Sequence, residues 1–264
     1  IVDMPQDGLF NISMIFKAME RNGKDLNVAV SIDGKLPFDS ADSFVFKRIW
    51  ENETEILQDA WGNDIRPKQR GKYIWQNRVF TNSQGVFYED CLFYFKKGKN
   101  KLTIKNNDGA FSLDSLIIHQ TEAIPTYSEY MEIHKNKKSE NEYVGVIKIQ
   151  AEDVSLKSDS ILYPMSDRTD ASIEPSDPYN IKLNVFGSHN WQYPGQFATW
   201  IIDIPESGFY KIALRVKQNF NRGMYSSRKI YIDGKVPFKE MEAYGFKYGN
   251  RWYTEVLSGD EPYL

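Results

Sequence analysis

The chain has 264 residues, of which 41% are hydrophobic, 26% charged and 14% aromatic. This apolar content is enough for a sizeable core and excludes a globally disordered chain. The formal net charge of -3 disfavours a protein that binds nucleic acid by neutralising many phosphates. One cysteine cannot form an internal disulfide, three scattered histidines disfavour a histidine metal site, and no apolar run approaches the length of a membrane span.

Taken in chain order, the expected strands mostly alternate apolar and polar residues, a period of two that buries one face of a sheet. Asp33-Gly34 and Asp233-Gly234 each follow such a run and predict tight hairpin turns. The expected strands cover residues 10–16, 29–32, 92–95, 102–104, 113–118, 144–152, 199–204, 210–216 and 230–232.

One segment breaks this pattern. Thr126 and Glu129 have the spacing of a helical capping box, and Tyr127, Tyr130 and His134 follow at helical spacing. We therefore expect a short helix and a solvated linker near residues 120–143. With many short strands and little helix elsewhere, the chain is predicted to be an all-β, antiparallel β-sandwich.

The chain also repeats itself. Residues 1–38 and 201–238 align without a gap at an offset of 200. The thirteen identical pairs are Ile1/Ile201, Asp3/Asp203, Pro5/Pro205, Gly8/Gly208, Ile12/Ile212, Lys17/Lys217, Gly23/Gly223, Ile32/Ile232, Asp33/Asp233, Gly34/Gly234, Lys35/Lys235, Pro37/Pro237 and Phe38/Phe238. We call residues 1–122 copy one and residues 144–264 copy two, joined by a linker at 123–143. Copy one is expected to be the C-terminal part of one repeat, with a long insertion near 50–90, and copy two the N-terminal part of the next.

Several motifs fall in a familiar order: Gln150-Ala151-Glu152 on an opening strand, Gly208-Phe209-Tyr210 on a middle strand, Gly98-Lys99-Asn100 before a penultimate strand, and Asp114 in the last. In this order they resemble the galactose-binding-like jelly-roll carbohydrate-binding modules. The tandem form resembles the N-terminal region of large extracellular solute-binding lipoproteins of bacterial carbohydrate ABC transporters. Copy one departs from the pattern with Phe10 where copy two has Tyr210.

The resemblance implies a structural calcium ion between the first and last strands, with Glu152 and Asp114 as its acidic ligands. These two residues belong to different copies, so each lacks its natural partner. Two ordinary carboxylates near strand ends are the alternative.

Sugar binding needs an aromatic face and polar groups that pair with hydroxyls. The loop Ser188–Gln196 offers Trp191 or Tyr193 as the platform and Asn190 beside it, unless Trp191 only plugs the end of the sandwich. A second set, Arg215, Gln218 and Arg222, is absent from copy one, which has Ile15, Ala18 and Asn22 there. It marks either a site in copy two or an ordinary charged strand face.

The insertion carries Trp50, Trp61 and Trp75, which argue against a disordered loop. It is expected either to wall a binding groove or to seal the interface between the repeats. No motif of a hydrolase, metalloprotease or nucleotide-binding enzyme is present, and Cys91 lies in an apolar run typical of a core.

Together, these observations and the resemblance predict a non-catalytic, extracellular or cell-surface bacterial module pair. Its expected partners are an oligosaccharide or a cell-wall or plant glycan, and transporter components. A structural spacer without ligand and an accessory module of a polysaccharide-degrading enzyme are the alternatives.

Overall fold

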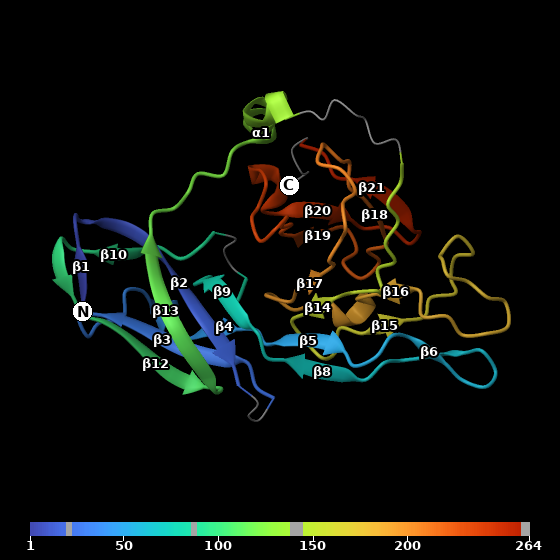
Figure 1. Ribbon diagram of the computed structural model, residues 1–264, viewed down its shortest axis with the longest axis horizontal. Coiled ribbons are helices and arrows are strands. Elements are labelled where there is room, and N and C mark those ends of the chain that lie inside the picture. The colour runs from blue at the N-terminus through green and yellow to red at the C-terminus, as the bar shows by residue number, and fades with distance from the viewer. Residues whose placement is uncertain (20–22, 86–88, 138–144, 260–264) are drawn as a thin grey trace. The chain divides into compact units, whose positions relative to one another are not determined.

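The computed structural model describes residues 1–19, 23–85, 89–137 and 145–259 (Figure 1). The chain forms two compact units. Unit 1 contains residues 1–121, 150–167 and 173–201, and unit 2 contains residues 122–149, 168–172 and 202–264. The architecture is all-β and antiparallel, as predicted, and no described helix is long and apolar enough to cross a bilayer.

Unit 1 contains an antiparallel β-sandwich. In one sheet β2 (Gly8–Ala18) pairs with β13 (Phe111–His119), β9 (Trp75–Val79) and β10 (Phe93–Phe95). In the other, β3 (Leu26–Ile32) lies between β12 (Leu102–Asp108) and β4 (Phe44–Phe46). The short strands β1 (Val2–Met4) and β11 (Gly98–Asn100) pair with each other.

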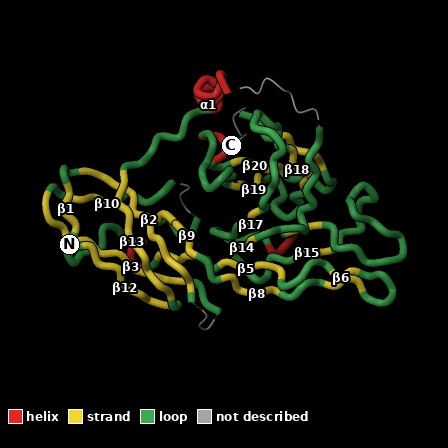
Figure 2. The backbone as a smooth tube through the Cα atoms, viewed as in Figure 1, coloured by secondary structure: helices red, strands yellow, loops and turns green. Residues whose placement is uncertain are grey.

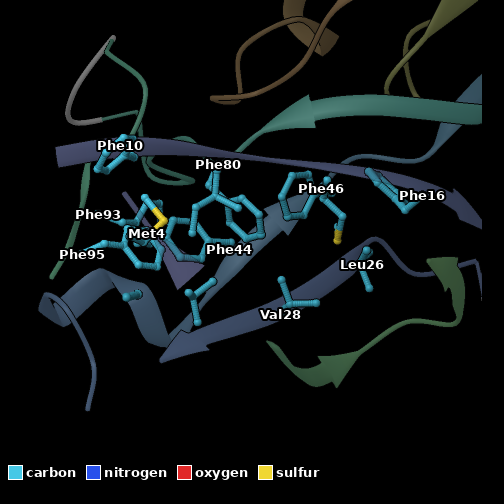
Figure 3. Packing of buried hydrophobic residues seen from close by; sticks show 14 residues of the cluster. Met4, Phe10, Phe16, Leu26, Val28, Phe44, Phe46, Phe80, Phe93 and Phe95 are labelled. Carbon is cyan, nitrogen blue, oxygen red and sulfur yellow. The ribbon is translucent and has the colours of Figure 1, made fainter. Parts of the chain in front are cut away.

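The core of this sandwich is built largely from phenylalanine (Figure 3). In β3 the alternation works as expected, because Leu26, Val28 and Val30 are buried while the residues between them are only half-buried. The Phe80 ring lies edge-on to Phe44, with ring centroids 4.9 Å apart. Such edge-to-face pairs suit the charge distribution of aromatic rings and fix how the two sheets pack.

The rest of unit 1 joins the insertion of copy one to residues 150–201. Here β5 (Ile49–Asn52) pairs with β8 (Gln69–Lys72) and, through Trp50 and Lys157, with β14 (Leu156–Lys157), which also pairs with β17 (Ala198–Thr199). Loops dominate this part of the chain (Figure 2). Its other strands are β6 (Leu57–Gln58), β7 (Asp64–Ile65), β15 (Pro164–Met165) and β16 (Val185–Phe186).

Unit 2 has two small sheets and one helix. Strand β18 (Ala213–Val216) pairs with β21 (Tyr253–Val256), and β19 (Tyr225–Arg228) pairs with β20 (Tyr244–Lys247). The helix α1 (Tyr127–His134) begins at the predicted capping box, with the Thr126 side chain accepting from the Glu129 backbone N–H, so the expected helix is confirmed.

The 200-residue repeat is visible in the strand registers. Copy one pairs Leu26 with Phe46 across β3 and β4, and copy two pairs Ser226 with Phe246 across β19 and β20. Both Asp-Gly turns adopt positive φ, with 51° at Asp33 and 50° at Asp233. The local geometry of the two copies is therefore the same at these turns and in these strand pairs.

A further correspondence lies beyond the aligned residues. The β2–β9 register places Phe16 opposite Gln76, and the β18–β21 register places Val216 opposite Tyr253, so the offset between the copies falls from 200 to 177. Copy one thus has 23 more residues than copy two between these strands. The same offset matches two cation–π pairs, Lys17 over Trp75 and Lys217 over Trp252, each at 5.4 Å from the ring centroid.

The copies differ where copy two lacks strand partners. Residues 208–212 form no strand, although their counterparts lie in β2, and Ile212 is 39% exposed whereas Ile12 is fully buried. In the described part of the chain β18 pairs with β21 alone, while β2 also pairs with β10 and β13. The expected strands at 144–152 and 230–232 are likewise not formed at residues 145–152 and 230–232, because no strand among the described residues pairs with them beyond one isolated bridge at Ile232.

Candidate functional site

The loop predicted to hold the sugar platform folds around Trp191. Its ring lies edge-on to Phe186 at 5.5 Å, and a Cβ added at Gly187 would lie 2.9 Å from the ring. The indole N–H points to the Gln196 carbonyl at 3.4 Å. Trp191 is therefore half-buried against its own loop, as the plug alternative describes, and only part of the ring can reach a ligand.

The remaining residues of this loop have different surroundings. Gln196 is buried and its side-chain oxygen accepts from the backbone N–H groups of Gln192 and Tyr193, both at 2.9 Å. Asn190 faces the Met165 sulfur at 3.7 Å, a weak contact. Tyr193 is 56% exposed and is the loop aromatic most open to a ligand.

The second predicted set lies in unit 2, whereas the Trp191 loop lies in unit 1. Gln218 is buried and braces its own loop, because its side chain accepts from the N–H groups of Phe220 and Asn221 and donates to the Met224 carbonyl. Arg215 donates to the Ser172 hydroxyl at 2.5 Å, and Arg222 is exposed. Gln218 is thus occupied by a structural role that the sequence did not reveal.

The predicted calcium ligands differ in environment. Glu152 is buried, at 4% exposed, whereas Asp114 is exposed at a bulge of β13 and accepts from the Ser115 hydroxyl at 2.9 Å. Within the described ranges no three His, Cys, Asp or Glu side chains come together as a metal site. The two residues do not amount to a ligand set for Ca²⁺, which needs six or more oxygens. Calcium binding remains a prediction, which a thermal melt with and without a chelator can test.

Cys91 lies against the phenylalanine core and is half-buried. Burial, with a smaller contribution from the charge of Asp90, raises the pKa of its thiol to about 11. The thiol is therefore protonated near neutral pH and is a weak nucleophile.

The structure reveals a depression that the sequence did not predict. It is open, has a volume of about 410 Å³, and lies wholly within unit 1. Trp50 forms its aromatic wall, and most of the remaining lining is polar. The lining residues are Gly23, Lys24, Asp25, Asn27, Val45, Trp50, Asp108, Asp159 and Ser160.

Hydrogen bonds and ion pairs fix the polar walls of this depression. Asp25 accepts from the Lys47 ammonium at 2.8 Å and from the Arg48 backbone N–H at 3.1 Å. Asp108 accepts from Lys24 at 2.7 Å, and this hydrogen bond is the main reason that the pKa of its carboxyl is lowered. The arrangement therefore places carboxyl oxygen acceptors beside an aromatic ring.

One tryptophan of the insertion, Trp50, lines this depression. Trp50 comes from β5, whose pairing with β14 brings Asp159 and Ser160 near residues that the sequence separates by more than a hundred positions. The pairing of Asn27 with Asp108 across β3 and β12 brings two further lining residues together. Neither that pairing nor the approach of Asp159 had a local signal in the sequence.

Comparisons with protein-family models, with curated proteins and with solved structures find no match to this chain.

Proposed function

We propose that the chain is a non-catalytic carbohydrate-binding protein, and that the depression beside Trp50 binds a neutral sugar. The observation that carries this proposal is the combination of one tryptophan with three aspartates and an asparagine in one concave site. An aromatic ring can stack on the apolar face of a pyranose, while carboxylate and amide oxygens accept hydrogen bonds from its hydroxyl groups.

The charge of the site supports a neutral ligand. Three carboxylates line the depression, and Lys24 is the one cationic side chain in its described lining. Phosphate-rich partners such as nucleic acid are disfavoured by such a surface, because they need cations to neutralise them. A sugar with free hydroxyl groups needs acceptors, which this site provides.

The wider setting of the proposal follows from the sequence resemblance. A jelly-roll module pair in an extracellular or cell-surface bacterial solute-binding lipoprotein would use a shallow site of this kind to hold a glycan near a sugar importer. Weak binding at one site would be raised by the second module through avidity. An accessory module of a polysaccharide-degrading enzyme would use the site in the same way.

Isothermal titration of the chain with neutral oligosaccharides of plant and bacterial cell walls tests the proposal. Asp108→Asn and Asp159→Asn keep the side-chain shape but remove the charge, and each should weaken binding roughly tenfold, the cost of about one charged hydrogen bond. Asp39→Asn is the matched control, because Asp39 is exposed and does not line the depression. If no oligosaccharide binds, the chain is better described as a structural spacer. If all three variants bind as well as the wild type, the depression is not the binding site.

A further inference from the structure

Two aromatic side chains are unusually exposed. Among the large apolar side chains in the described residues, only four are more than three-quarters exposed: Ile1, Trp61, Val146 and Tyr179. Ile1 is the first residue, and Val146 lies in a stretch without regular structure. Trp61, at 79%, and Tyr179, at 89%, instead lie on hydrogen-bonded turns of unit 1.

The turn that carries Trp61 is held by Asp59. One carboxylate oxygen of Asp59 accepts from the backbone N–H groups of Trp61 and Asn63, both at 2.9 Å, and the other accepts from the Asn63 amide at 3.0 Å. Gly62 adopts φ of +85°, which glycine tolerates best. The backbone of Trp61 is thus fixed although its side chain is in solvent.

The turn that carries Tyr179 has the same design. Asp177 accepts from the backbone N–H groups of Tyr179 and Asn180, both at 2.8 Å. Two aspartate-centred turns therefore each present one exposed aromatic ring.

The two turns are joined to each other. The Asp64 backbone N–H donates to the Ile181 carbonyl, and the Ile181 N–H donates to the Asn63 side-chain oxygen, both at 2.9 Å. A Cβ added at Gly62 would lie 3.3 Å from the Asn180 amide nitrogen. The two turns therefore contact each other through neighbours of Trp61 and of Tyr179, so the two exposed rings belong to adjoining turns.

We propose that Trp61 and Tyr179 form an aromatic platform that stacks on the sugar rings of a neutral polysaccharide. This second glycan contact is separate from the depression and shares with the proposed function only the class of ligand. The hydrogen-bonded backbone of each turn favours such binding, because little backbone entropy is lost when the turns meet a ligand.

The charged groups around the two rings disfavour anionic partners. Asp59 and Asp177 flank the two rings, and their hydrogen bonds to Asn63 and Asn180 lower the pKa of each carboxyl, so both stay ionised at neutral pH. Single-stranded nucleic acid and anionic lipid surfaces need cationic residues beside the aromatics. The ammonium of Lys182 does lie beside the Trp61 turn, where it donates to the Gly62 carbonyl at 3.2 Å, but it pairs with Asp64 at 3.3 Å, so its charge is balanced by that carboxylate. A neutral polymer with apolar ring faces fits this surface best.

Native gel electrophoresis in gels that contain a soluble neutral polysaccharide tests the platform. The probes are xylan, mixed-linkage β-glucan and galactomannan, each in a separate gel. We expect retardation of the wild-type chain by at least one of them, with roughly tenfold weaker binding for Trp61→Ala and for Tyr179→Ala. Trp75→Ala is the matched control, since Trp75 is a half-exposed tryptophan of the same unit that lies under Lys17 rather than on either turn.

The outcomes separate this inference from the proposed function. Loss of retardation in the two turn variants, with Asp108→Asn still retarded, supports the platform. Equal retardation of the wild type, Trp61→Ala and Tyr179→Ala overturns it, even if the depression variants lose binding, and so does the absence of any retardation. Binding to phosphatidylserine vesicles or to a protein that depends on Trp61 would also overturn it, because the rings would then serve another partner. Thermal melts of each variant exclude misfolding as the cause.

Discussion

Phe80→Ala should be among the most destabilising single substitutions in unit 1. The side chain is fully buried, and its ring is edge-on to Phe44 at 4.9 Å and to Phe46 at 5.0 Å. A buried phenylalanine removes roughly 150–250 Å² from water, worth about 4–6 kcal/mol at about 25 cal/mol per Å². Alanine retains about 1 kcal/mol of this, so we expect a loss of about 3–5 kcal/mol, in line with other phenylalanine truncations in cores.

The chain provides a matched position for this experiment. The Phe80 N–H donates to the Ile12 carbonyl and the Leu257 N–H donates to the Ile212 carbonyl, both at 2.9 Å, so Leu257 is the counterpart of Phe80 in copy two. Leu257 is only partly buried, and Leu257→Ala should cost less than half as much. Because the two units need not unfold together, hydrogen exchange of peptides from β2 and β18 during a urea titration is the suitable assay. A loss below about 1 kcal/mol in β2 for Phe80→Ala would refute the assignment of Phe80 to the centre of the core.

Three further outcomes follow from individual residues. Burial lowers the pKa of Lys157 to about 8. Between pH 8 and the unfolded pKa near 10.4, the unfolded chain therefore binds more protons than the folded chain, and the free energy of unfolding should rise with pH. Urea titrations should show this slope in Cys91→Ala, which removes the thiol whose pKa is also shifted in this range, and not in Cys91→Ala/Lys157→Met. The thiol of Cys91, with its pKa raised to about 11, should react slowly with iodoacetamide at pH 7.5, and the alkylation rate should increase only well above the ordinary thiol pKa. Rapid alkylation of the folded chain at pH 7.5 would contradict the burial of this thiol. Gly34→Ala and Gly234→Ala replace glycines at φ of +77° and +78° that have open space at Cβ. Each substitution should therefore lower the free energy of unfolding by about 1–2 kcal/mol through backbone strain alone. Thermal melts that show markedly unequal costs would mean that the two turns are not equivalent.

Features that depend on local sequence were predictable. Asp33-Gly34 and Asp233-Gly234 specify tight turns through their own backbone preferences, and Thr126 and Glu129 specify the start of α1 in the same way. The offset of 200 between these turns also predicts equivalent strands on both sides of each. The matching registers of β3–β4 and β19–β20 agree with this expectation, but residues 30–32 lie in β3 whereas residues 230–232 form no strand.

Features that depend on a partner strand were not predictable to the same extent. The alternation of residues 210–216 favours a strand throughout, but only Ala213–Val216 forms one, because β21 pairs with these residues and not with 210–212. A period-two pattern shows which face of a strand would be buried, whereas the ladder of hydrogen bonds depends on residues elsewhere in the chain.

The candidate sites show the same division between local and long-range information. The polar residues at 59 and 177 are typical of turns that cap their own backbone, so each turn could be inferred from a few neighbouring residues. That the two turns meet depends on hydrogen bonds between Asn63 or Asp64 and Ile181, more than a hundred positions apart. Aromatic residues on separate loops are brought near each other only through such a contact. The tryptophans of the insertion predicted an ordered segment, whereas the surroundings of Trp50, Trp61 and Trp75 depended on the fold.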